Sequence, residues 1–91
     1  MAGRIEVMQL KPGEYRVRVV EAGGEPSHVV TLRAGDHQRI AAGKATPEEL
    51  LRWSFEFLLE REPKESILAR FDLPVIARYF PEYEQEIKRR L

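Results

Sequence analysis

The segment "TPEELLRWSFEFLLERE" (residues 46–62) decides the fold of this chain, because it carries the strongest local signals. Thr46 is placed to cap a helix, Pro47 follows at the first helical position, and Glu49 at the third completes a capping box. Pro63 comes next and cannot continue a helix. The sequence therefore predicts one long helix that fills this segment.

The apolar side chains of this predicted helix cover more of its circumference than one contact needs. At about 100° per residue they sweep roughly two-thirds of the circle. They are Leu50, Leu51, Trp53, Ser54, Phe55, Phe57, Leu58 and Leu59, and the remaining strip holds Glu49, Arg52, Glu56 and Glu60. A helix that covers one sheet needs an apolar stripe of only about 100°. We therefore expect it to pack between a sheet and a second layer of the same chain.

The sheet is predicted before this helix, where three runs are rich in β-branched residues. The runs are "RIEVMQL" (4–10), "EYRVRVVE" (14–21) and "HVVTLR" (28–33). In the second run Tyr15, Val17 and Val19 share one face, whereas Arg16 and Arg18 share the other. A three-stranded antiparallel meander with one apolar face is the simplest arrangement.

The connections between these runs carry their own signals. Pro12 and Gly13 suit a type II turn, because Pro presets φ and Gly accepts a positive φ. The loop "AGGEPS" (22–27) separates the second and third runs. Residues 36–43 fit either a short helix capped by Asp36 or an extended connector, and the sequence leaves both open.

After the long helix, prolines at positions 63, 74 and 81 divide the chain into short apolar segments. The segments with helical spacing are "PKESILARF" (63–71), "LPVIARYF" (73–80) and "PEYEQEIKRRL" (81–91). We expect two or three short C-terminal helices that fold back over the long one. The predicted fold is a single α+β domain over residues 1–91, with a β-meander in 1–35 and a helical part in 46–91.

Composition excludes several kinds of protein. With 43% hydrophobic and 33% charged residues, the 91-residue chain is typical of one globular domain. It has no cysteine, so disulfides, thiolate metal sites and cysteine nucleophiles are excluded. No apolar run reaches the roughly 18 residues that cross a bilayer, and no secretory signal is visible, so we expect a cytoplasmic protein. Many charges without asparagine or cysteine favour either heat adaptation or a GC-rich genome.

No motif indicates catalysis or a cofactor. His28 and His37 are the only histidines, and their spacing does not match a metal site. Ser54 lies within an aromatic stretch of the predicted helix rather than on a strand-to-helix turn, so a packing role is favoured over a nucleophile. No phosphate-binding glycine loop is present. We therefore expect no catalytic residue, no metal and no cofactor.

Nucleic-acid binding finds little support in the sequence. The stretch "ESILARFDLPVIARYF" (65–80) has the outline of a helix-turn-helix, but Leu73, Pro74, Val75 and Ile76 occupy the positions that would read bases. The formal net charge is zero, which gives no general attraction for phosphates. A compact helical cap on the core is favoured.

One weaker feature points to an anionic partner. Arg16 and Arg18 share an exposed strand face, which Arg33 joins if the strand register allows it, and such a face is able to hold RNA or an acidic protein. Protection of an exposed strand from aggregation explains the same charges, and glutamates close in sequence would neutralise them.

Aromatic residues provide the candidate interface. Trp53, Phe57, Tyr79, Phe80 and Tyr83 belong to residue types that dominate interface energetics. A homodimer or another protein would cover them if the short helices leave them exposed, and burial within the chain is the alternative. The sequence thus favours a non-catalytic protein–protein interaction or homo-oligomerisation module over a nucleic-acid-associated regulator.

Two resemblances accompany this interpretation. Residues 54–83, through "FLLEREPKESIL", "FDL" and "YFPEY", resemble a pattern of small bacterial proteins without assigned function, which implies no activity. "ATPEELL" (45–51) is similar to the helix start of HicB-type antitoxins, which implies regulation by protein and nucleic-acid contacts. The chain departs from these antitoxins because it lacks their proline–glycine signature and a DNA-binding tail.

Overall fold

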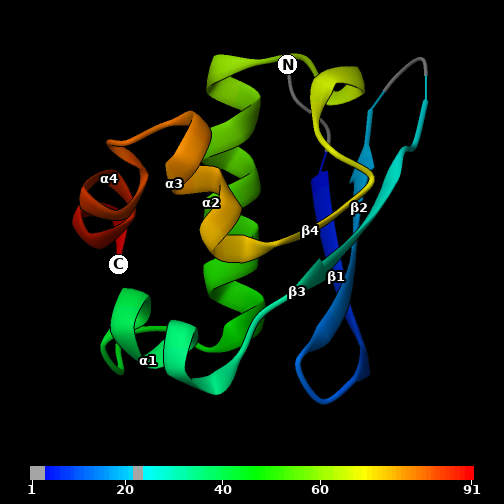
Figure 1. The fold of residues 1–91 in the computed structure, drawn as a ribbon. Helices are drawn as coiled ribbons and strands as arrows, with labels where there is room; N and C mark the ends of the chain where they lie inside the picture. The colour runs from blue at the N-terminus through cyan, green and yellow to red at the C-terminus, as the bar shows by residue number, and fades with distance from the viewer. Residues whose placement is uncertain (1–3, 22–23) are drawn as a thin grey trace.

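The computed structural model describes residues 4–21 and 24–91 and has an α+β fold (Figure 1). Its strands are β1 (Arg4–Lys11), β2 (Glu14–Val20), β3 (Ser27–Thr31) and β4 (Arg70–Asp72). Its helices are α1 (Ala34–Ala41), α2 (Pro47–Arg61), α3 (Ile76–Tyr79) and α4 (Tyr83–Arg90), with 3₁₀ turns at Lys64–Ser66 and Leu73–Val75. None of the helices in the described ranges has the length and apolar character needed to cross a membrane.

The sheet has four strands in the order β1-β2-β3-β4, so the predicted three-stranded meander is incomplete. The first three strands do pair antiparallel, with Val17 opposite both Val7 and His28. β4 then pairs parallel to β3, where Val30 lies opposite Phe71. The sheet is mixed because the chain crosses over through α1 and α2 before it returns beside β3.

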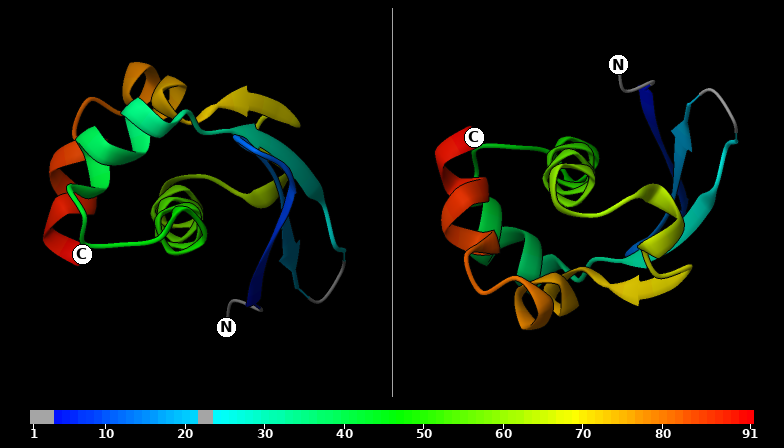
Figure 2. Two further views of the ribbon diagram at one scale, coloured as in Figure 1. Left: turned by 90° about the horizontal axis from the view of Figure 1, so that it is seen from below. Right: turned by 90° about the horizontal axis from the view of Figure 1, so that it is seen from above.

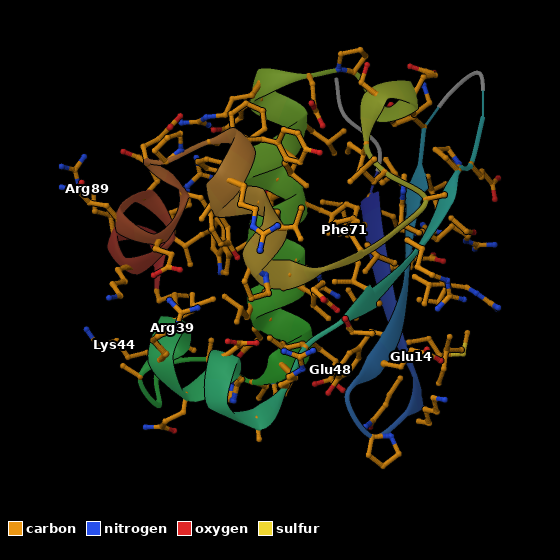
Figure 3. The ribbon with its side chains drawn as sticks, viewed as in Figure 1. Glu14, Arg39, Lys44, Glu48, Phe71 and Arg89 are labelled. Carbon is orange, nitrogen blue, oxygen red and sulfur yellow. The ribbon has the colours of Figure 1, made fainter. Side chains whose placement is uncertain are left out.

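The predicted helix over 63–71 is wrong, because only Lys64–Ser66 forms a helical turn before the chain extends into β4. The Val29 N–H donates to the Ala69 carbonyl at 2.8 Å, which ties the extended segment to β3. Phe71 points inward and contacts Phe55, with ring centroids 6.1 Å apart. In Figure 3, Phe71 lies between α2 and the strands. Tertiary pairing therefore overrides the local helical spacing.

Helix α2 confirms the prediction from its cap to its end. The Glu49 N–H donates to the Thr46 hydroxyl, and the Glu49 carboxylate accepts from the Thr46 N–H, so both halves of the capping box form. The helix ends at Arg61, two residues before Pro63. Seen along its axis, α2 lies between the sheet on one side and α1 and α4 on the other (Figure 2). The expected second layer is present.

The buried face of α2 covers less of the helix circumference than the predicted apolar arc. Its buried side chains are Leu50, Leu51, Ser54, Phe55, Phe57 and Leu58. Trp53 instead lies on the solvent-facing strip with Arg52, Glu56 and Glu60, and its side chain is 37% exposed. One side of α2 thus stays in water, and Trp53 is part of it.

The connections agree with one prediction and settle one open point. Gly13 has φ of 79°, which matches the predicted type II turn. Residues 36–43 belong largely to helix α1, which begins before Asp36 and is followed by Ala42 and Gly43 in left-handed conformations. Of the predicted loop 22–27, residues 22 and 23 lie outside the described residues.

Candidate functional site

Two of the five predicted interface aromatics lie in the core. Phe57 and Tyr83 are fully buried, with ring centroids 5.3 Å apart in an edge-on arrangement. Phe80 packs on Phe57 at 5.9 Å and is half-buried. Because α4 and α3 of the same chain cover Phe57, this residue and Tyr83 are unable to contact a partner in this conformation.

The other predicted aromatics do not form one surface. Trp53 lies among the charged residues of α2, whereas Tyr79, at the end of α3, is 65% exposed. Tyr79 and Phe80 line a groove in which Trp53 takes no part. Of the five candidate aromatics, Tyr79 and Phe80 thus line one groove, and Trp53 lies apart from it.

This groove has a mostly apolar lining and a volume of about 130 Å³. Its lining comes from the end of α2, the segment leading into β4, and α3. The lining residues are Leu58, Glu62, Ser66, Ile67, Leu68, Phe71, Val75, Ile76, Tyr79 and Phe80. At its rim Leu68 is 46% exposed, opposite the apolar residues of α3. We call this site the α2–α3 groove.

Proline positions create the groove. Pro63 follows the end of α2, so the chain turns at Lys64–Ser66 and descends as an extended segment rather than as a helix on α2. Pro74 starts the turn Leu73–Val75, which directs α3 across the end of that segment. A helix over 63–71 would have covered this part of α2, so the wrongly predicted helix is also the reason the groove was missed.

The electrostatics of the groove are simple. Glu62 is the only ionisable carboxylate in its lining, and Ser66 supplies a hydroxyl. Nearby Lys64 forms ion pairs with Glu65 at 3.1 Å and Glu21 at 3.3 Å. Hydrogen bonds to Glu65 and then Glu21 raise the pKa of Lys64, so this cation is already paired. The groove therefore presents an apolar floor with one acidic group at its side.

The predicted arginine face is largely neutralised. Arg18 donates to Glu6 at 2.6 Å, and hydrogen bonds from Arg4 and then Arg18 lower the pKa of the Glu6 carboxyl. Arg16 is exposed on the same face. Arg33 leaves the sheet altogether, because it precedes the first residue of α1. Arg16, Arg18 and Arg33 are thus not brought together as one anion site.

Two buried polar groups were only partly foreseen. Ser54 donates to the Leu50 carbonyl at 2.7 Å and accepts from the Tyr83 hydroxyl at 2.6 Å. His28 lies beneath Phe55, with its Nδ1 2.7 Å from the Leu68 carbonyl, while its Nε2 has no partner among the described residues. Two sequence features could have indicated that these groups are buried. Ser54 lies within the apolar arc of a helix, and His28 lies in a strand of alternating pattern.

Neither histidine is part of a metal cluster within the described ranges. His37 bonds to the Ala45 carbonyl through Nε2 at 2.7 Å and fixes the end of the α1–α2 connection.

Comparisons with protein families, curated proteins and solved structures found no match for this chain.

Proposed function

We propose that this protein is a non-catalytic protein–protein interaction module that holds an apolar segment of a partner protein in the α2–α3 groove. The observation that carries the proposal is the position of Leu68 and Tyr79. Both are large, exposed and apolar, and both lie at the rim of one apolar hollow. Exposed apolar groups that gather around a concavity are typical of binding sites.

The size of the groove indicates the kind of occupant. A cavity of about 150 Å³ is large enough for a benzene-sized group, and the groove measures about 130 Å³. One aromatic or branched aliphatic side chain of the partner would fill it as an anchor. Glu62 at the side of the groove favours a lysine or arginine near that anchor.

The same lining supports binding more than catalysis. Catalytic sites bring several titratable groups to one concavity, whereas the groove has one carboxylate and no histidine or cysteine. Nucleic-acid-associated or antitoxin-like regulation stays the alternative prediction. It has less support, because Glu6 already pairs with Arg18 on the sheet face.

The proposal is tested by NMR titration of the ¹⁵N-labelled protein with a short amphipathic helical peptide. The peptide carries one phenylalanine with lysines on the same face, and its partner peptide has alanine in place of the phenylalanine. We expect amide shifts confined to the groove lining with the first peptide and much smaller shifts with the second. Leu68→Lys should abolish the response, because it places a charge at the rim while the backbone carbonyl that His28 contacts remains.

Met8→Lys is the matched variant for this experiment. Met8 is 56% exposed on the opposite face of the sheet. Replacing this exposed apolar residue by lysine should therefore leave the peptide response intact. Absence of shifts at millimolar peptide, or equal responses of the Leu68→Lys and Met8→Lys variants, would contradict binding in the groove.

A further inference from the structure

Strand β1 ends the sheet, and no other strand of the described residues pairs with its outer backbone edge. It spans Arg4–Lys11, whereas β4 at the other end of the sheet has only the three residues Arg70–Asp72. Proteins protect such edges with short strands, charged side chains, prolines, inward-pointing charges or bulges. Of these, β1 has the charged side chains of Arg4, Glu6 and Lys11. β1 has no proline, its inward residues are Ile5, Val7 and Gln9, and its bulge lies beyond Gln9.

The hydrogen-bond pattern shows which groups of β1 face outward. The Val19 N–H donates to the Pro26 carbonyl, and the Leu32 N–H donates to the Gly13 carbonyl, so the odd-numbered residues of β2 bond to β3. Bonding sides alternate along a strand, so the even-numbered residues of β2 bond to β1. Since Glu6 lies opposite Arg18, the even residues of β1 bond inward and the odd ones face the free edge.

We propose that two copies of this chain pair through their β1 edges, antiparallel and centred on Val7, to form one continuous sheet. In this register Val7 lies opposite Val7 of the partner copy, and Ile5 lies opposite Gln9. Val7, Ile5 and Gln9 all direct their N–H and carbonyl groups outward. The Val7–Val7 pair and the two Ile5–Gln9 pairs can each form two backbone hydrogen bonds, so the contact forms roughly six. The contact is isologous, as a two-fold dimer requires.

Neighbouring registers fit less well. A shift by two residues in one direction places Glu6 opposite Glu6 of the second copy, and like charges directly opposite are unfavourable. A shift in the other direction brings Lys11, beyond the bulge, opposite Ile5. The register centred on Val7 instead sets Glu6 opposite Met8, whose side chain is exposed. It uses the regular part of β1 and opposes no like charges.

The surface beside the edge also favours a second copy. A hollow of about 320 Å³ lies between β1 and the solvent-facing strip of α2. Its lining includes the half-buried apolar residues Ile5 and Leu59 together with Arg52 and Glu56. Side chains of a paired copy would complete the cover of these apolar groups, and a strip with both charge signs can pair with itself across a two-fold axis.

The test is the molar mass in solution by sedimentation velocity at several concentrations. We expect the unmodified protein to shift from monomer to dimer as its concentration rises. Gln9→Pro removes an outward N–H that the β1–β2 ladder does not use, so it should raise the dimer dissociation constant by roughly tenfold or more with the fold intact. Gln9→Thr keeps the N–H and should dimerise like the unmodified protein.

A second pair of variants tests the register. Val7→Lys and Val7→Glu each place like charges at the two-fold axis, so each alone should be monomeric, and an equimolar mixture should form a heterodimer. Circular dichroism verifies that each variant is folded. A monomeric unmodified protein at every concentration, a Gln9→Pro dimer of unchanged affinity, or folded Val7 variants that stay monomeric when mixed would overturn the proposal.

Failure here is distinguishable from failure of the groove. The Leu68→Lys variant, which tests the α2–α3 groove, leaves the β1 edge untouched and should keep the dimer mass. A dimer that depends on Leu68 rather than on Gln9 would assign self-association to the groove and overturn pairing through β1.

Discussion

Tyr83 and Ser54 show how single polar groups fix the position of α4 on α2. The Tyr83 hydroxyl donates to Ser54, which in turn donates to the Leu50 carbonyl, and both side chains are fully buried. Serine within a helix commonly bonds to the carbonyl four residues earlier. Here that bond orients the Ser54 oxygen towards Tyr83. Ser54 therefore links α2 to α4 through hydrogen bonds, whereas its sequence context favoured a role in packing.

Removing the acceptor of this pair should cost more than removing the donor. Ser54→Ala leaves the Tyr83 hydroxyl buried without a partner, and we expect a loss of about 1–3 kcal/mol in the free energy of unfolding. Tyr83→Phe removes the hydroxyl but leaves the Ser54 bond to Leu50 intact, so it should cost less. Urea denaturation of both variants measures the difference, and the reverse order would contradict a bonded pair.

Alkaline pH should weaken the same contact. Burial, more than any nearby charge, raises the pKa of Tyr83 well above its ordinary value of 10.0. The folded state then holds the proton more tightly than the unfolded state, so stability is complete below about pH 10 and falls as pH rises beyond it. Thermal unfolding followed from pH 8 upward should show this fall, and Tyr83→Phe should make it shallower. An equal fall in both proteins would exclude Tyr83 as its source.

Helix α2 depends on its first turn for its starting position. Thr46→Ala removes the side-chain half of the capping box, and we expect a loss of about 0.5–2 kcal/mol in the free energy of unfolding. Thr46→Ser retains the hydroxyl and should lose much less. Thermal and urea unfolding of the two variants provides the comparison, and equal stability of Thr46→Ala and the unmodified protein would show that the cap contributes nothing.

The contrast between α2 and β4 shows what the sequence was able to predict. The cap at Thr46 and the stop at Pro63 are local signals, so the bounds of α2 followed from sequence alone. β4 has only three residues, and Phe71 is its single inward side chain. An alternation this short also fits helical spacing, and its partner β3 is far away in sequence. Only the tertiary pairing decides between the two.

The groove itself was not predicted, although two of its lining residues were among the candidate interface aromatics. Tyr79 and Phe80 were selected as candidate interface aromatics from their residue types, and their role in binding stays a prediction. The exposed position of Leu68 was not foreseen, because the expected helix would have turned it towards α2. Phe57 and Tyr83 share the residue types of an interface, but composition does not reveal which chain covers them. That depends on the path between Pro63 and Pro81.

Ion pairs between distant elements hold the helical layer in place. Arg39 of α1 pairs with Glu84 of α4. In Figure 3, helix α4 lies above the labelled Arg39. Arg61 of α2 pairs with Glu82 at 3.0 Å, at the start of α4. Lys64 pairs with Glu21, so a similar contact joins the turn after α2 to the end of β2. Each pair is partly exposed and contributes little alone, but together they link α1 and α2 to α4 and the turn after α2 to the end of β2.

Acidification should therefore loosen the contacts of α4 before it disturbs the apolar core. A hydrogen bond from Arg90 lowers the pKa of the Glu60 carboxyl below its ordinary value of 4.5. The pKa of the Glu82 carboxyl is also lowered, first by a hydrogen bond from the Glu82 backbone and then by a hydrogen bond from Arg61. Folded-state pKa values below the unfolded ones give stability that is present above about pH 4.5 and lost as pH falls further.

We expect Glu60→Gln to lower the melting temperature slightly at pH 7 and to make its decline between about pH 5 and pH 3 shallower. Glu56→Gln is the matched variant, because Glu56 lies on the same exposed strip of α2 and has no ion-pair partner among the described residues. Its decline should follow that of the unmodified protein. Added salt should reduce the difference between the two variants, since screening weakens exposed pairs most. If the Glu60 and Glu56 variants decline in parallel at low salt, the Glu60–Arg90 pair does not contribute to the acid stability of the fold.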